Sequence, residues 1–218
     1  MNEVLRVVEN EVQLVALAIF LSIYLVRLNW LRSLRSPGEA ALPKASATTG
    51  VLLSFGSVFL PWTMESTRKH LAVYVEFALF HVAVAIAILA SFTLPYAPQL
   101  MSQPIVYACI FFLAFGVVAG VVRIRRRLVN SNMRAINTPD DYFAITVITV
   151  WFLTALWGLG TMSALGLTVY FGLTALLLVY VPLSKVSHYL YMPFTRFYFG
   201  YSFGRRGVTV KKNQWRYN

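Results

Sequence analysis

Five apolar stretches constrain the fold of this chain more than any other feature. Each is about twenty residues long or longer, which allows a helix to cross a hydrocarbon core of roughly 30 Å. The chain has 218 residues, of which 58% are hydrophobic and 12% are charged, so little polar surface remains for a soluble domain. We therefore expect an all-α integral membrane protein, a bundle of five transmembrane helices over residues 12–31, 71–94, 104–123, 142–160 and 164–191.

A sixth apolar segment, VLLSFGSVFLPW at residues 51–62, is too short to span a bilayer. We expect it to form a short interfacial helix in the first cytoplasmic connection, lying along the membrane surface or buried against the bundle. The transmembrane domain is predicted over residues 1–204, followed by a basic cytoplasmic tail at residues 205–218. The acidic N-terminus, MNEVLRVVENE, lacks the basic start of a signal peptide, so the first span should be retained.

The distribution of basic residues predicts the orientation. The chain has 19 Lys and Arg against 8 Asp and Glu. All but Arg6 lie in or beside the first connection, the third connection or the C-terminal region, whereas the connections TLPYAPQLMSQP and GLGTMSALG carry none. Because short cytoplasmic loops are enriched in Lys and Arg, we expect the N-terminus outside and the C-terminus inside. These charges serve orientation first, and no nucleic-acid partner is expected.

Two histidines are predicted to lie within spans, His81 in the second and His188 near the end of the fifth. His81 follows Lys69 by twelve residues, about 18 Å along a helix, and His188 precedes Arg196 by eight residues, about 12 Å. Since these spans are antiparallel, both imidazoles are expected in the cytoplasmic half at comparable depth. Intramembrane ionisable residues are expensive and are functional candidates.

Such a pair of imidazoles is typical of the axial ligands of a b-type haem, which also needs an apolar slot and cations at its rim. Ala78 and Ala85, on the face of His81, would leave room for a flat macrocycle. Lys185 and Arg196, with the arginine run at 123–127, are candidate partners for the propionates. The alternative for each histidine is a hydrogen bond between helices, and zinc is disfavoured because Glu76 is the sole further ligand near that depth.

Several other residues have a structural and a chemical interpretation. His70 lies among basic residues at the predicted interface, where it is either solvated or a hydrogen-bond partner for a quinone headgroup. Glu76 either reaches towards Arg68 and Lys69 or accepts a proton in quinol chemistry. Two further features favour packing alone: the GxxxG pair Gly116 and Gly120, and the single cysteine, Cys109.

Three segments resemble one family of membrane cytochromes. They are ALFHVAV, RIRRRLVNSNMRAINTPDDYFAI and VPLSKVSHYLYMPFTRFYF. The sequence is similar to the gamma subunit of respiratory nitrate reductase. It is closest in outline to the membrane cytochrome b subunits of heterodisulfide reductase and of the dissimilatory sulfite reductase-associated membrane complex. The resemblance implies a prokaryotic cytoplasmic-membrane subunit that oxidises a quinol of the menaquinone type and passes electrons through haem to a cytoplasmic iron–sulfur subunit.

The resemblance assigns His81 and His188 as the ligands of the haem nearest the cytoplasm. Two-haem members of the family have a second histidine pair, but the corresponding residues here are Ser91 and Tyr170. We therefore expect one haem b and an electron-transfer subunit of a larger oxidoreductase rather than a complete enzyme. A haem-free membrane anchor or assembly subunit is the main alternative. A small transporter is a third, which the lack of internal repeats and broken helices weakens.

Overall fold

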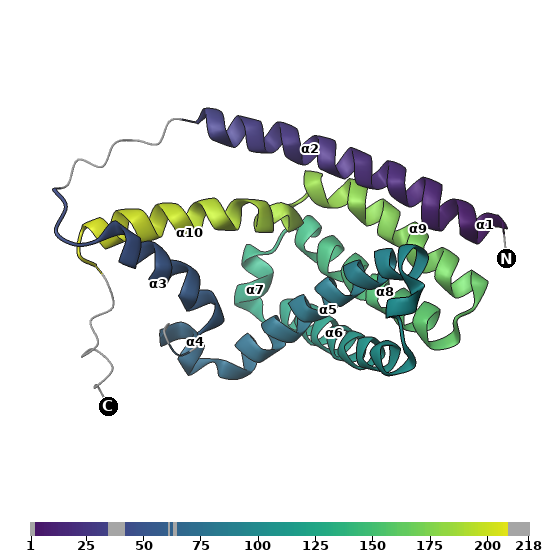
Figure 1. Ribbon diagram of the computed structural model, residues 1–218. Coiled ribbons are helices and arrows are strands. Elements are labelled where there is room, and N and C mark those ends of the chain that lie inside the picture. Colours follow the sequence, from purple (N-terminus) through teal and green to yellow (C-terminus); the bar gives the residue numbers. More distant parts are fainter. Residues whose placement is uncertain (1–2, 35–41, 61, 63–64, 209–218) are drawn as a thin grey trace. The chain divides into compact units, whose positions relative to one another are not determined.

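The computed structural model describes residues 3–34, 42–60, 62 and 65–208, and its elements are labelled in Figure 1. The chain divides into two compact units. The first unit comprises Met1–Asn29 and Val75–Val186, and the second comprises Trp30–Tyr74 and Ser187–Asn218. The predicted basic tail, residues 205–218, lies outside the described residues from position 209 onward.

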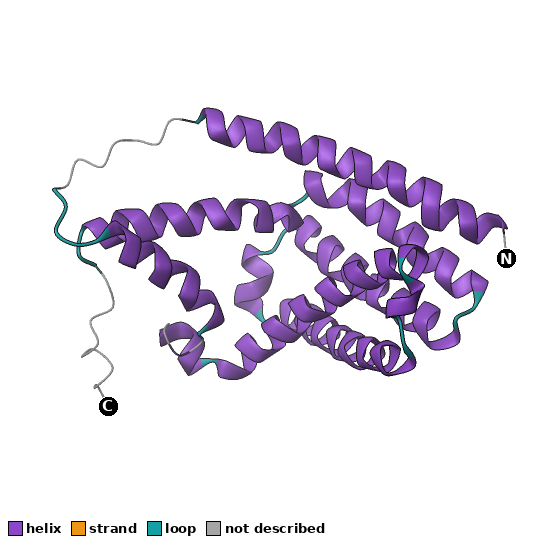
Figure 2. Cartoon of the chain, in the orientation of Figure 1, coloured by secondary structure: helices purple, strands orange, loops and turns teal. Residues whose placement is uncertain are grey.

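Every regular element among the described residues is helical (Figure 2). In the part of the chain that the structure describes, five helical segments are long and apolar enough to cross a membrane, which confirms the predicted fold class. The first, Glu3–Ser33, joins α1 (Glu3–Arg6), the π-helical turn η1 (Val7–Val12) and α2 (Gln13–Ser33). The other four are α5 (Leu71–Tyr96), α6 (Gln103–Val129), α8 (Pro139–Thr161) and α9 (Ala164–Tyr180) with the 3₁₀ turn η4 (Val181–Leu183).

The fifth span ends at Leu183, so the predicted continuation to residue 191 was wrong. Pro182 lies in η4, where its missing N–H and its ring interrupt the helical hydrogen-bond ladder. A second 3₁₀ turn, η5 (Lys185–Ser187), follows, and a separate helix, α10 (His188–Arg205), begins at His188. His188 is therefore the first residue of a new helix and not part of the fifth span.

The remaining helices are short. The predicted short helix is α3 (Ala47–Phe59), which begins at the N-cap Ser46. The others are α4 (Glu65–Lys69), η3 (Pro98–Leu100) and α7 (Ser131–Ile136). At the start of α8, Thr138 and Asp141 form a capping box in which each side chain accepts a backbone hydrogen bond.

The core of the first unit depends on close approaches between α5, α6 and α8. A Cβ added at Gly116 would collide with Ala83, and one at Gly120 would collide with the side chain of Thr149. The GxxxG pair therefore serves close packing, as the sequence indicated. Phe152 and Phe171 are completely buried in the same core.

The second unit is built on an antiparallel pair, α3 and α10, which lie side by side in Figure 1. Gly50 of α3 faces Gly200 and Gly204 of α10, another GxxxG pair. A Cβ at Gly200 would lie 2.6 Å from the Cα of Val51, and one at Gly204 would lie 2.9 Å from the Cα of Gly50. The backbone N–H groups of Lys44 and Ala45 donate to the carbonyl oxygen of Arg205 and close the end of the pair. This contact was not predicted, although the GxxxG spacing of Gly200 and Gly204 is its signal in the sequence.

These distances predict a contrast between two identical substitutions. Gly200→Ala should destabilise the second unit by about 1–3 kcal/mol, because the new methyl group meets backbone atoms that cannot move aside. Gly56→Ala, in α3, adds its methyl group where nothing lies within 4 Å and should be neutral or slightly stabilising. Thermal unfolding of both variants in one detergent provides the measurement. Equal midpoints for the two variants would contradict the tight contact.

Candidate functional site

His81 lies on α5 within the first unit, where it is half-buried. Its Nδ1 is 2.8 Å from the carbonyl oxygen of Phe77, one helical turn earlier. Because a carbonyl oxygen only accepts hydrogen bonds, Nδ1 carries a proton, and in the neutral form of the ring Nε2 carries the lone pair. This is the arrangement that orients a metal-ligating imidazole in proteins. The local geometry of His81 therefore fits axial ligation through Nε2.

Two phenylalanine rings of α5 flank the imidazole. The ring centroid of Phe77 is 4.1 Å from that of His81, and the centroid of Phe80 is 6.0 Å away. Ala78 is half-buried and Ala85 is exposed on the same helix, so the neighbouring positions are small, as the sequence suggested. Arg123 of α6 lies over both phenylalanine rings, 5.7 Å from the centroid of Phe77 and 5.1 Å from that of Phe80.

Glu76 connects this aromatic group to the arginine run of α6. Its carboxylate accepts a hydrogen bond from Nε of Arg123 at 2.9 Å and a second one from Arg126. The Glu76 side chain is 14% exposed and that of Arg123 is 21% exposed, so the ion pair is largely shielded from solvent. One of the two interpretations of Glu76 from the sequence was that it reaches towards Arg68 and Lys69, whereas its partners in the structure are Arg123 and Arg126. This double ion pair favours a structural role for Glu76 over proton transfer.

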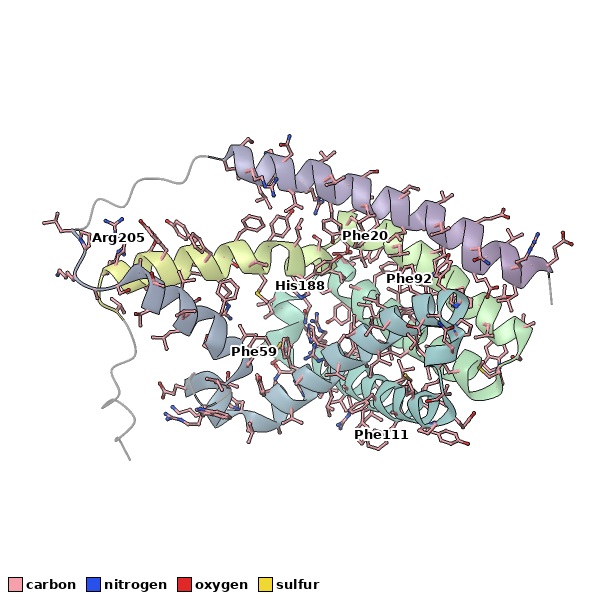
Figure 3. All side chains as sticks on the ribbon, in the orientation of Figure 1. Phe20, Phe59, Phe92, Phe111, His188 and Arg205 are labelled. Carbon is pink, nitrogen blue, oxygen red and sulfur yellow. The ribbon has the colours of Figure 1, made fainter. Side chains whose placement is uncertain are left out.

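His188 and Arg196 belong to α10 in the second unit. His188 is exposed, and Figure 3 labels it at the beginning of the helix. Its ring makes an edge contact with Tyr189, with 6.4 Å between the centroids. Arg196 is half-buried, and its Nη1 donates to Oγ of Ser57 of α3 at 3.4 Å. Arg196 therefore has a place in the α3–α10 contact besides its predicted role towards a propionate.

Lys185 already has an anionic partner. Its Nζ lies 2.6 Å from Oγ1 of Thr138 and 3.3 Å from Oδ2 of Asp141. These contacts tie η5 to the capping box of α8, and the hydroxyl of Tyr180 strengthens the same junction by donating to Asp140. The carboxylates at this junction were not among the predicted site residues. Their signal in the sequence is the pattern TPDD, in which a capping threonine is followed three residues later by an acid.

His70, the predicted quinone contact, lies in the turn between α4 and α5 and is exposed in the second unit. Its carbonyl oxygen accepts the backbone N–H groups of Val73 and Tyr74, so this residue starts α5. Nearby, Lys69 pairs with Glu65 at 2.6 Å on the surface of α4. Within the described residues, no group of three or more His, Cys, Asp or Glu side chains is arranged to hold a metal ion.

Two positions noted in the sequence, Ser91 and Tyr170, belong to a buried polar cluster. Ser91 and Tyr170 are both completely buried, as is Gln13 at the start of α2. Nε2 of Gln13 donates to the carbonyl oxygen of Ser91 at 2.9 Å, and the hydroxyl of Tyr170 donates to the carbonyl oxygen of Ala87. Oε1 of Gln13 has no hydrogen-bond partner among the described residues. The cluster joins α2, α5 and α9, and the glutamine inside an apolar stretch was its signal in the sequence.

Comparisons with known proteins found no matching family model, no matching curated protein and no matching solved structure.

The double ion pair predicts a charge-specific loss of stability. Glu76→Gln should lower the free energy of unfolding by about 1–3 kcal/mol, because it leaves two shielded guanidinium groups without their carboxylate. Thermal unfolding in detergent is the measurement, and Glu65→Gln is the matched control because it breaks an exposed pair. Adding Arg126→Gln to Glu76→Gln should restore part of the loss. A Glu76→Gln variant as stable as the control would show that the pair contributes nothing.

Proposed function

We propose that this chain is a membrane cytochrome b subunit that carries electrons between a quinone pool and a cytoplasmic iron–sulfur partner. The observation that carries the proposal is the orientation of His81, whose Nδ1–H···O=C bond to Phe77 presents Nε2 as a ligand. When bound, a haem b supplies a one-electron carrier whose potential depends on its axial ligands, burial and hydrogen bonding. One haem is proposed, with His81 and His188 as its axial ligands.

The residues around His81 have distinct tasks in this proposal. Phe77 orients the imidazole through its carbonyl oxygen and, with Phe80, provides apolar ring surface beside it. Arg123 contributes positive charge over those rings, and Glu76 holds that guanidinium in place. A cation held near a redox centre favours its reduced form, because reduction removes one positive charge from the centre. Lys185 is engaged by Asp141, so we propose Arg196 as a contact for a propionate in preference to Lys185.

The partners follow from the same proposal. We propose a prokaryotic cytoplasmic membrane as the location and a menaquinone-type quinol as the electron donor, with His70 as a candidate headgroup contact. Arg125 and Arg134 are exposed at the end of the α6–α7 segment and offer a basic surface to an iron–sulfur subunit of the heterodisulfide reductase or nitrate reductase type. The reaction of the complex would be completed by that partner, so the chain alone is not proposed to be a complete enzyme.

A haem-free membrane anchor is the second candidate, and two observations favour it. Lys185 is paired with Asp141 and not left for a propionate, and His188 is an exposed residue at the start of α10, beyond the end of the fifth span. In an anchor, His81 would serve packing with Phe77 and Phe80, and the basic residues would serve orientation and docking.

Absorption spectroscopy of the purified full-length protein decides between the two. We expect a b-type spectrum on reduction and one haem per chain. His81→Ala and His188→Ala should each lower the haem content, because each removes one of the two axial nitrogens that the proposal assigns to the iron. His70→Ala is the matched control and should keep the full haem content.

Circular dichroism of the same samples establishes that each variant is folded. A folded, colourless wild-type protein would contradict the cytochrome proposal and support the haem-free anchor. Retention of haem in both His81→Ala and His188→Ala would refute the proposed ligands.

A further inference from the structure

The α3–α10 pair of the second unit contains two apolar helices that are not suited to cross a membrane. α3 has 13 residues and is therefore about 20 Å long, shorter than a hydrocarbon core of roughly 30 Å. α10 has 18 residues, but it contains Arg196, Pro193 and Arg205, and it is not among the candidate spans. The apolar side chains of the pair must therefore be removed from water in a way other than by crossing the membrane.

The contact between the two helices uses their small residues and leaves their large ones outside. Gly50 and Ser54 of α3 face Gly200 of α10, and Ser57 accepts a hydrogen bond from Arg196. The large apolar side chains point away from this contact: Phe59 is 77% exposed and Leu52 is 69% exposed on α3. On α10, Phe197 is 56% exposed and Phe199 is 51% exposed. Figure 3 shows Phe59 on α3 and Arg205 at the far end of α10.

The charge of this unit is strongly one-sided. Its described residues include seven Lys and Arg but one acidic residue, Glu65, which is paired with Lys69. Four of the basic residues belong to α10 or to the segments that flank the pair: Lys44, Arg196, Arg205 and Arg206. Exposed aromatic side chains together with Arg and Lys are typical of helices that lie in the headgroup region of a bilayer.

We propose that the α3–α10 pair is an in-plane module that binds an anionic phospholipid surface. Its aromatic side chains enter the boundary between headgroups and acyl chains, and the exposed cations Lys44 and Arg206 contact lipid phosphates. The positive charge of the pair favours an anionic lipid surface over a second copy of the chain, because two copies would bring like charges together. The proposal does not depend on haem and goes beyond the proposed electron transfer.

Spin labelling of the full-length protein in vesicles tests the proposal. In a Cys109→Ser background, a nitroxide is attached at Phe197→Cys, and a second preparation carries it at Asn132→Cys in α7 as a matched control. Each is reconstituted in vesicles of phosphatidylcholine alone or of phosphatidylcholine with phosphatidylglycerol. Power saturation then compares the accessibility of the label to oxygen, which enters the acyl region, with its accessibility to a water-soluble nickel chelate.

We expect the oxygen-to-nickel ratio at position 197 to be high in anionic vesicles and to fall to that of the control label in neutral vesicles. Neutralising two cations with Lys44→Gln and Arg206→Gln should lower the ratio in anionic vesicles as well. Equal ratios at position 197 in the two lipid mixtures would overturn the proposal. Spin–spin broadening that grows with the fraction of labelled chains would also overturn it and would assign this face to self-association.

Discussion

The structure depends on the rule that backbone polar groups in hydrocarbon must be satisfied within the chain itself. A helix meets this rule over its whole length, which explains why the long apolar stretches form helices. Polar side chains in these helices follow the same rule. Thr93, Thr149 and Thr168 each donate to the carbonyl oxygen four residues earlier, so none of these hydroxyls requires water. Helices whose polar groups are hydrogen-bonded internally can then associate mainly through van der Waals contact between their surfaces.

Small residues allow this close contact between helices in both units. Apolar side chains gain little by leaving lipid for the protein interior, so association depends on close van der Waals contact and a few hydrogen bonds. Gly116 and Gly120 bring α6 against α5 and α8, whereas Gly50, Gly200 and Gly204 bring α3 against α10. The contact of α6 with α5 and α8 belongs to a core in which Phe152 is buried. The contact of α3 with α10 leaves the large apolar side chains of both helices exposed. The same packing device therefore produces a closed core in one unit and an aromatic surface in the other.

The charged residues near the candidate site are arranged as pairs. Arg123 forms an ion pair with Glu76 and lies over the rings of Phe77 and Phe80. The ring of Phe77 also contacts the imidazole of His81, so the ion pair and the imidazole contact the same aromatic side chain. Lys185 is held by the capping box of α8, where it joins the end of the fifth span to the start of the fourth. These contacts show that a basic residue near a predicted cofactor can have a structural partner, which spacing along the sequence does not reveal.

The sequence by itself determined the membrane-spanning class, five apolar helices and a short helix near residues 51–62, which the structure places at Ala47–Phe59, because length and hydropathy are local properties. It also identified the Gly116 and Gly120 packing pair. Tertiary structure decided the rest. The fifth span ends at Leu183 because Pro182 interrupts the helical hydrogen bonds. α10 starts at His188 as a separate helix, which packs against α3 through its glycines. The partners of Glu76 and Lys185 lie 44 to 50 residues away in sequence, and only folding brings such groups into contact.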